Sequence, residues 1–421
     1  MKTYFNNIFL FIMMKTYNKR DIYINKIKPF INKDIIKVLI WQRRVWKSYI
    51  LFQIMDELKN NFWVLEKQII YINKELNDFD FIKDYNDLLS YIKKWDSESG
   101  SLWKIKKYVF IDEIQDVINF EKALRDLQAI WNYDIYISGS NANMLSSEIA
   151  TYLTWRYIEF EIFPLIYKEF LDFHKLQNSK ESFLKYMKFW WLPYLKNLEL
   201  QEEIVYDYIK SIYNTILLKD IVKRYSIRNI DFIEKLIMFL SDNIWSLFTA
   251  NNISKYLKSQ KIEIWTNIVL EYISYLCNVY LINKVKRQEI VWKKIFEIND
   301  KFYFSDLWIR NVLLWWYKQV DIWKIIENIV FLHFKAHSYS IHIWKNKDKE
   351  IDFIVEKSGD IKYIQVAYLI ESDNTKQREF DNLIEIKDNY EKIVLSLDDF
   401  IDWNYKWIKH YNLIDYILKF K

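Results

Sequence analysis

Five short apolar runs, separated by stretches with helical spacing, occupy the first 165 residues. The runs are rich in β-branched and aromatic side chains, and they lie at 35–40, 68–72, 108–111, 135–138 and 156–162. Continuous apolar runs of this length are typical of strands buried on both faces. Between the first two runs, Ile50, Ile54 and Leu58 recur at the spacing of one helix face. Strands that alternate with helices predict an α/β fold with a mostly parallel sheet.

The pattern changes twice after this first part. Helical spacing dominates to about residue 225, three short helices and a β-ribbon follow, and mixed strands and helices return after about residue 300. We therefore predict an α/β core, a helical lid or linker, a winged-helix-like domain and an α+β C-terminal domain, at 18–165, 166–225, 226–298 and 299–421.

Residues 1–17 are predicted to be an N-terminal extension, of which the part before the true start is not translated. Lys15-Thr16-Tyr17 repeats Lys2-Thr3-Tyr4, and no small-residue cleavage site follows the short apolar stretch between them. A start codon assigned too far upstream explains this better than a signal peptide does, and translation would then begin at Met13 or Met14.

Composition adds a second hypothesis. The chain of 421 residues has 3 Gly and 19 Trp, whereas average usage would give about 29 glycines. Few glycines leave few ways to build left-handed turns and helix ends. We infer that UGA was read as Trp here, whereas the source reads UGA as Gly. The alternative is a genuinely Trp-rich protein.

Charge and cysteine content narrow the class of protein. The net charge of +5 permits contact with nucleic acid but does not argue for it. The single cysteine, Cys277, excludes a disulfide framework and suits a reducing cytoplasm. No apolar run reaches the ~18 residues that a membrane span needs, so we expect a cytoplasmic protein with no membrane contact.

The turn after the first run has the spacing of a phosphate-binding loop. "WQRRVWKS" becomes G-x-x-x-x-G-K-S if both tryptophans are glycine. Such a loop turns backbone N–H groups toward phosphates, and its lysine and serine contact the phosphates and Mg²⁺. The alternative is an ordinary strand-turn-helix with a basic tip. The predicted ATP-binding residues are Trp41, Gln42, Arg43, Arg44, Val45, Trp46, Lys47, Ser48 and Tyr49.

Two later strands end in matching polar groups. "YVFIDEIQ" ends in Asp112 and Glu113, which would hold Mg²⁺ together with Ser48 and polarise the attacking water, respectively. "IYISGSNA" ends in Ser140 and Asn141, of which one would contact the γ-phosphate. Solvated acids and a simple turn are the alternatives.

Three arginines have open roles. Arg156, at the start of the fifth run, is either a sensor or finger for the nucleotide or a structural surface residue. Arg43 and Arg44 face either the nucleotide or a neighbouring subunit.

The order of the loop, "FIDEIQ", "ISGSNA" and "RYIEFEIFPLIYKEF" resembles a family of prokaryotic AAA-type P-loop ATPases. In that family, a C-terminal domain of unknown function has a restriction-endonuclease-like, PD-(D/E)XK fold. The resemblance covers the chain from about residue 18 and implies binding and hydrolysis of ATP with Mg²⁺. Family members have glycine at the positions of Trp41, Trp46, Trp155, Trp190, Trp191 and Trp308, which supports the recoding hypothesis.

Residues 251–257 and 266–273 resemble a helix-turn-helix, and 282–296 could form its basic wing, with Lys284, Lys286, Arg287, Lys293 and Lys294. Such domains often bind DNA. The second helix has no arginine, however, so contact with a protein, including another copy of this chain, is the alternative.

The C-terminal domain lacks part of the nuclease motif. Glu327 lies on a predicted helix and Asp352 on a strand, but Gln365-Val366-Ala367 stands where the motif has E-x-K. Metal-dependent cleavage needs that second carboxylate and the lysine. We therefore predict a domain that does not cleave nucleic acid. The function predicted overall is a Mg²⁺-dependent ATPase, and the alternative is a DNA- or protein-binding module that uses nucleotide only as a switch.

Overall fold

The computed structural model describes residues 18–98, 106–130, 132–142, 156–189, 192–198, 201–243, 250–259, 265–288, 301–314, 322–346, 349–370, 373–399 and 403–420. The extension 1–17, Trp155, Trp190, Trp191, Lys293 and Lys294 lie outside these ranges. The chain divides into two compact units, Met1–Ile162 and Phe163–Lys421.

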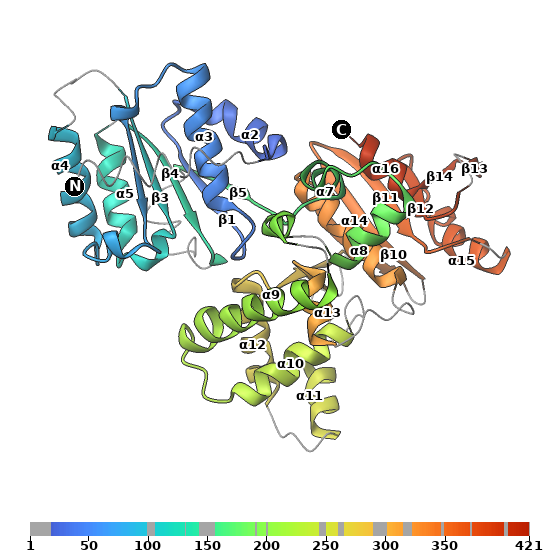
Figure 1. Ribbon diagram of the computed structural model, residues 1–421. Helices are drawn as coiled ribbons and strands as arrows, with labels where there is room; N and C mark the ends of the chain where they lie inside the picture. The colour runs from blue at the N-terminus through green and yellow to red at the C-terminus, as the bar shows by residue number, and fades with distance from the viewer. Residues whose placement is uncertain are drawn as a thin grey trace. The chain divides into compact units, whose positions relative to one another are not determined.

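The first unit is a five-stranded parallel sheet with helices on both faces (Figure 1). The strand order is β2-β3-β4-β1-β5, the arrangement of an AAA-type P-loop fold. Its strands are β1 (Ile36–Ile40), β2 (Ile69–Asn73), β3 (Lys107–Asp112), β4 (Tyr133–Gly139) and β5 (Tyr157–Glu161). All five predicted strands are thus confirmed, and so is the parallel α/β fold.

The helices of this unit fall into two layers. In Figure 1, α2 and α3 lie on one face of the sheet and α4 and α5 on the other. Their bounds are α2 (Asp21–Ile27), α3 (Lys47–Asn61), α4 (Tyr85–Glu98) and α5 (Phe120–Ala129). Every residue of β1 and β3 is buried, which explains their continuous apolar sequence. The carboxyl ends of β1, β3 and β4 therefore open onto one edge of the sheet, because all strands are parallel.

The second unit begins with helices, as predicted. They are α7 (Tyr167–His174), α8 (Lys180–Phe189), α9 (Glu202–Thr215), a π-helix (Ile216–Lys223), α10 (Ile230–Asp242), α11 (Ala250–Ser259) and α12 (Thr266–Asn278). α11 packs against α12, and β6 (Ile282–Val285) follows. The antiparallel partner of β6 is β8 (Lys301–Phe304). The predicted boundary at residue 298 therefore falls between two paired strands.

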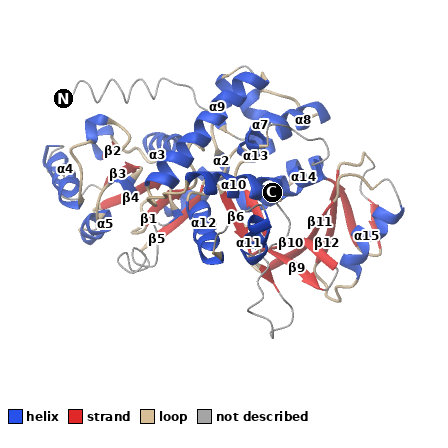
Figure 2. Cartoon of the chain, turned by 90° about the horizontal axis from the view of Figure 1, so that it is seen from below, coloured by secondary structure: helices blue, strands red, loops and turns tan. Residues whose placement is uncertain are grey.

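The rest of this unit is a seven-stranded mixed sheet with helices, drawn in red and blue in Figure 2. The strand order is β13-β14-β12-β11-β10-β9-β7, and α15 packs on β10, β11 and β12. The bounds are β7 (Arg287–Gln288), α13 (Leu307–Leu313), α14 (Ile322–Ala336), β9 (Ser340–Asn346), β10 (Lys349–Lys357), β11 (Asp360–Val366), α15 (Asp373–Ile384), β12 (Glu391–Ser396), β13 (Trp403–Tyr405), β14 (Ile408–Asn412) and α16 (Leu413–Lys419). Within the described ranges, none of the helices has the length and apolar composition required to span a bilayer.

Candidate nucleotide site

The loop between β1 and α3 has the backbone of a phosphate cradle. Trp41, Arg44 and Trp46 have φ values of 153°, 68° and 68°, in a region that favours glycine. α3 begins directly afterwards, at Lys47. The loop therefore ends at a helix N-terminus, where backbone N–H groups are free to bind an anion.

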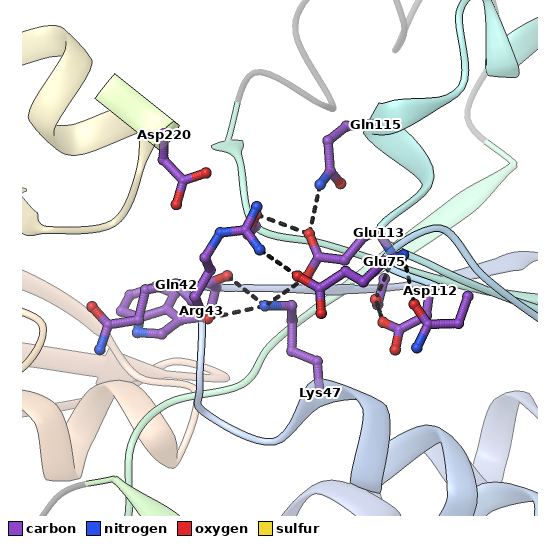
Figure 3. A network of polar contacts seen from close by, with 12 residues as sticks. Gln42, Arg43, Lys47, Glu75, Asp112, Glu113, Gln115 and Asp220 are labelled. Carbon is purple, nitrogen blue, oxygen red and sulfur yellow. Dashed lines mark hydrogen bonds and ion pairs between the residues drawn. The ribbon is translucent and has the colours of Figure 1, made fainter. Parts of the chain in front are cut away.

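The Lys47 ammonium lies inside this loop (Figure 3). Its Nζ donates to the carbonyl oxygens of Trp41 and Gln42 at 3.0 and 2.9 Å, and it lies 3.6 Å from Glu113 Oε1. Lys47 is 4% exposed. The charge is thus held at the carboxyl edge of the sheet, facing the acidic end of β3.

Asp112 and Glu113 occupy different environments at the end of β3. Asp112 accepts hydrogen bonds from the hydroxyls of Tyr71, at 2.9 Å, and of Ser138 and Ser48. Glu113 Oε2 accepts from Gln115 Nε2 at 2.5 Å and from Ser140 Oγ at 2.9 Å. β4 lies between β1 and β3 in the sheet, so its end brings Ser138 and Ser140 between the loop and the acids.

The pKa values of the two carboxyl groups are shifted in opposite directions. Burial raises the pKa of Asp112, and the neighbouring Glu113 charge raises it further. Burial also acts to raise the pKa of Glu113, but Lys47 and Arg43 outweigh it, and the pKa of Glu113 is lowered. The surroundings therefore favour the ionised form of Glu113 more than that of Asp112.

Strain accompanies this arrangement. Glu113 has φ 54° and ψ 50°, a left-handed conformation that costs a non-glycine residue on the order of 1–2 kcal/mol. Residues held this way cluster at functional sites, where the surrounding structure over-determines them. Here the Glu113 side chain is fixed by Ser140 and Gln115, and its backbone N–H donates to Ser138 Oγ at 3.2 Å.

The backbone and donor set fit Mg²⁺ and a triphosphate. The loop supplies the helix N-terminus and Lys47, while Ser48 and Asp112 supply the oxygen ligands that Mg²⁺ prefers. Gln42 Oε1 is buried and has no hydrogen-bond partner in the described part of the chain, so it can accept from a ligand. The indoles fit less well, because Trp46 packs on Tyr49 with ring centroids 4.4 Å apart and is only 8% exposed.

Other predicted residues lie in or near the loop. Arg43 is buried, and its guanidinium donates to Glu75 Oε1 at 2.5 Å. Arg44 is exposed. Val45 is buried, and its carbonyl accepts from Arg20 at 3.1 Å. Asn141 directly follows Ser140 at the same edge of the sheet and is partly buried.

Arg156 lies apart from this cluster. It is exposed, and its carbonyl accepts from the backbone of Ile36, at the start of β1. Ile36 is the first of the five residues of β1 and the loop follows the last of them, so the two ends lie roughly 13–16 Å apart at the rise of a strand. The structure thus places Arg156 at the amino edge of the sheet, away from Lys47 and Glu113 of the same chain.

Three residues contribute to the site although the sequence did not predict them: Tyr71, Ser138 and Glu75. Tyr71 and Ser138 donate to Asp112, and Glu75 pairs with Arg43. Ser138 is the last polar residue before Gly139 in the fourth apolar run, so a serine inside an otherwise apolar strand was the available signal. Tyr71 and Glu75 carried no comparable signal.

Comparison with known proteins agrees with this geometry. A family model described as an AAA domain matches residues 33–171. A protein of Haemophilus influenzae described as uncharacterized is 33% identical over 91% of this chain and 94% of its own length. The chain belongs to this AAA-domain family. A second uncharacterized protein, from Methanocaldococcus jannaschii, is 31% identical to the AAA-domain chain over 83% of it and 80% of its own length.

The remainder of the AAA-domain protein matches two domains of unknown function, DUF8612 at residues 181–319 and DUF4143 at 324–409. Among solved structures, the Aeropyrum pernix ORC1 protein in complex with DNA is similar, with 12% identity and a TM-score of 0.32. That match covers 71% of this chain and 92% of the other, and it is too distant to support an argument about function.

Proposed function

We propose that this AAA-domain protein is a Mg²⁺-dependent ATPase. The observation that carries the proposal is the meeting of four groups at one edge of the sheet: the Lys47 ammonium, the Ser48 hydroxyl, and the carboxyl groups of Asp112 and Glu113. Lys47 and the loop amides hold the phosphates, and Ser48 and Asp112 hold the metal ion. When bound, Mg²⁺ neutralises charge that develops on the phosphates.

Glu113 is the general base in this proposal. It stays ionised because Lys47 and Arg43 lower its pKa, and Ser140 and Gln115 fix the orientation of its carboxylate. An ionised and oriented carboxylate can accept the proton of a water molecule at the open end of the site. Asn141 lies next to Ser140 and is the proposed contact for the terminal phosphate. Arg156 could act only on a nucleotide outside its own chain's site, as a finger toward a neighbouring copy.

We also propose that the tryptophans at 41 and 46 are glycines in the native protein. Of the fourteen non-glycine residues with positive φ in the described ranges, four are Trp, although Trp makes up only 19 of 421 residues. A bulky aromatic residue is among the least suited to this backbone region. Glycine adopts it at no steric cost, and it would clear the space that the Trp46 ring fills.

Two positions outside the nucleotide site support the same proposal. Trp63 has φ 56°, follows the end of α3 and is 85% exposed, at a point where helices commonly end in a left-handed glycine. Trp407 has φ 61° and is 72% exposed. It is the second residue of the two-residue turn between β13 and β14, and Lys406 also has positive φ, as the glycine-favouring type I′ turn requires.

Nucleotide affinity tests both proposals. The Trp41→Gly/Trp46→Gly chain is compared with the chain as written, using a fluorescent ATP analogue with Mg²⁺. The matched control is Trp63→Gly/Trp407→Gly, which restores glycine at two left-handed positions away from the loop. We expect the loop variant to bind at least tenfold more tightly, a difference of about 1.4 kcal/mol, because glycine clears the space beside the loop that the Trp46 ring fills. Equal affinity in all three proteins would contradict the proposal, and intact mass of native material tests the recoding independently.

A DNA-binding role is a second candidate, and the order α10, α11, α12 and the β6–β8 pair favours it, because this is the arrangement of a winged helix. In α12, however, no lysine or arginine is present, and Ile268 and Leu270 are exposed. Measuring binding to duplex DNA across a salt series separates the roles. A steep decrease of affinity with salt supports phosphate contact, whereas its absence favours a protein partner for α12.

We further propose that the C-terminal part is nuclease-like and does not cleave nucleic acid. Glu327 on α14, Asp352 on β10 and Gln365 on β11 are buried, in the order of the nuclease motif but with an amide in place of the second carboxylate. Metal-dependent cleavage that Asp352→Ala abolishes would overturn this part of the proposal.

A further inference from the structure

A lysine is buried among carboxylates in the second unit. Lys301, the first residue of β8, is 3% exposed. Its Nζ lies 2.6 Å from Glu350 Oε1, 3.1 Å from Glu327 Oε1 and 3.9 Å from Asp352 Oδ1. These residues come from β8, α14 and β10, three elements that are well separated along the chain. We refer to the four side chains as the Lys301 cluster.

The surrounding structure fixes the carboxylates of this cluster. Tyr303 OH donates to Glu327 Oε1 at 2.6 Å, and the backbone N–H of Val366 donates to Asp352 Oδ2 at 2.9 Å. The backbone of β8 is itself held to α14, because Asn328 bonds both the N–H and the carbonyl of Phe304 at 3.1 Å. The acceptor atoms therefore converge on one point, and the ammonium occupies it.

A further layer of polar atoms lies beside the cluster. Gln365 Nε2 donates to Glu379 Oε2 at 2.8 Å, and both residues are buried. Gln365 Oε1 is buried and has no hydrogen-bond partner in the described part of the chain. Three acidic side chains thus surround a single positive charge, and Glu379 adds a further charge near Asp352. Buried acids in this number repel one another unless a cation compensates them.

The charge of Lys301 is strongly favoured here. Burial acts to lower the pKa of Lys301, but Glu327, Asp352 and Glu350 outweigh it and raise that pKa above its ordinary value. The oxygens lie at ammonium distances from Nζ, whereas Mg²⁺ would need them at about 2.0–2.1 Å. Within the described ranges, no group of acidic, histidine or cysteine side chains has the arrangement of a metal site.

We propose that the Lys301 ammonium takes the place of a divalent cation among Glu327, Glu350 and Asp352. The cluster then has the ligands of a cation site but is closed to metal by the protein's own side chain. Shortening that side chain opens a site for a divalent metal ion with carboxylate ligands. This inference goes beyond the proposed ATPase, and it does not depend on nucleotide binding.

The test is a titration with Mn²⁺ and no nucleotide, because the signal of free Mn²⁺ in electron paramagnetic resonance decreases as the ion binds. The proteins are the full chain as wild type, Lys301→Ala and Lys301→Ala/Asp352→Asn. We expect stoichiometric binding to Lys301→Ala that is lost in the double variant, and none of it in wild type. Binding to wild type that Asp352→Asn removes would overturn the proposal, and so would a folded Lys301→Ala that binds no more Mn²⁺ than the double variant.

Thermal unfolding covers the case in which Lys301→Ala folds poorly. Removing the ammonium leaves the carboxylates uncompensated, so we expect the melting temperature to fall and Mn²⁺ to restore much of the loss. The ion should have no such effect on wild type or on the double variant. If Lys301→Ala is unfolded with and without Mn²⁺, the proposal is wrong. The same series in a Lys47→Ala background should give the same result, which separates this test from the fate of the ATPase proposal.

Discussion

Replacing Glu113 by glutamine tests the assignment of the general base. The substitution keeps the size of the side chain and its ability to accept from Ser140, now at 2.9 Å from Glu113 Oε2, but it removes the negative charge. Glu113 is 6% exposed, so an amide there has the same surroundings. Lys47 loses a partner at 3.6 Å but keeps the carbonyl oxygens of Trp41 and Gln42. We therefore expect Lys47 to stay in place.

The expected loss of rate follows from the role of Glu113 as general base. Loss of a positioned general base typically costs 10²–10⁴-fold in rate, or about 2.7–5.4 kcal/mol of transition-state stabilisation. Nucleotide affinity should stay the same or improve, because removing an anion near the phosphates lowers repulsion. The effect should therefore fall on turnover and leave binding nearly unchanged.

The assay is phosphate release by the Trp41→Gly/Trp46→Gly chain with and without Glu113→Gln, alongside equilibrium binding of ATP. The matched control is Glu75→Gln, which also converts a glutamate near the loop to an amide. Glu75 pairs with Arg43 and its side chain is 48% exposed. Losing this ion pair should therefore reduce the free energy of unfolding by no more than ~1 kcal/mol. If Glu113→Gln turns over ATP as fast as its parent, Glu113 is not the base and the mechanism proposed above is wrong.

Three further predictions concern stability and metal dependence. Lys37 and Asp134 form a fully buried ion pair, so Asp134→Asn should destabilise the chain by about 3–5 kcal/mol in urea unfolding; a loss below 1 kcal/mol would contradict this. Burial and Lys196 lower the pKa of His174 to about 4, so the neutral ring is favoured in the fold. The fold has its full stability with respect to His174 above the unfolded pKa near 6.5, and this stability decreases as the pH falls toward 4. His174→Asn should therefore reduce the slope of melting temperature against pH over that range, and an unchanged slope would show that His174 does not cause it. Ser48→Ala removes a predicted metal ligand, so the Mg²⁺ concentration at half-maximal ATPase rate should rise at least several-fold, whereas an unchanged value would place Ser48 outside the metal site.

Much of the first unit could be predicted from the sequence. Parallel strands buried on both faces have continuous apolar sequences, and each observed strand begins and ends within two residues of its predicted run. The ends of these strands then gave Lys47, Asp112 and Glu113 as neighbours. The prediction rested on the phosphate-loop spacing of "WQRRVWKS", followed in the chain by an apolar strand that ends in two acids.

Contacts that depend on which strands are neighbours in the sheet could not be predicted in this way. Tyr71 reaches Asp112 because β2 pairs with β3 in one register, and a single sequence does not state which strands are neighbours. Arg156 was proposed as a sensor or finger, with a structural surface role as the alternative, but the start of a parallel strand lies at the opposite edge from the loop. Lys301 was missed because its partners Glu327 and Asp352 come from later elements, and a lysine near the predicted boundary at residue 298 has no distinctive pattern.

β8 serves two parts of the second unit at once. Its backbone pairs with β6, while the side chains of Lys301 and Tyr303 bond Glu327 on α14. A truncated fragment ending before β8 would leave β6 with an unpaired edge, which is an aggregation hazard, and a fragment beginning after β8 would leave the buried acids without their counter-ion. The helical part and the mixed sheet should therefore unfold as one cooperative block.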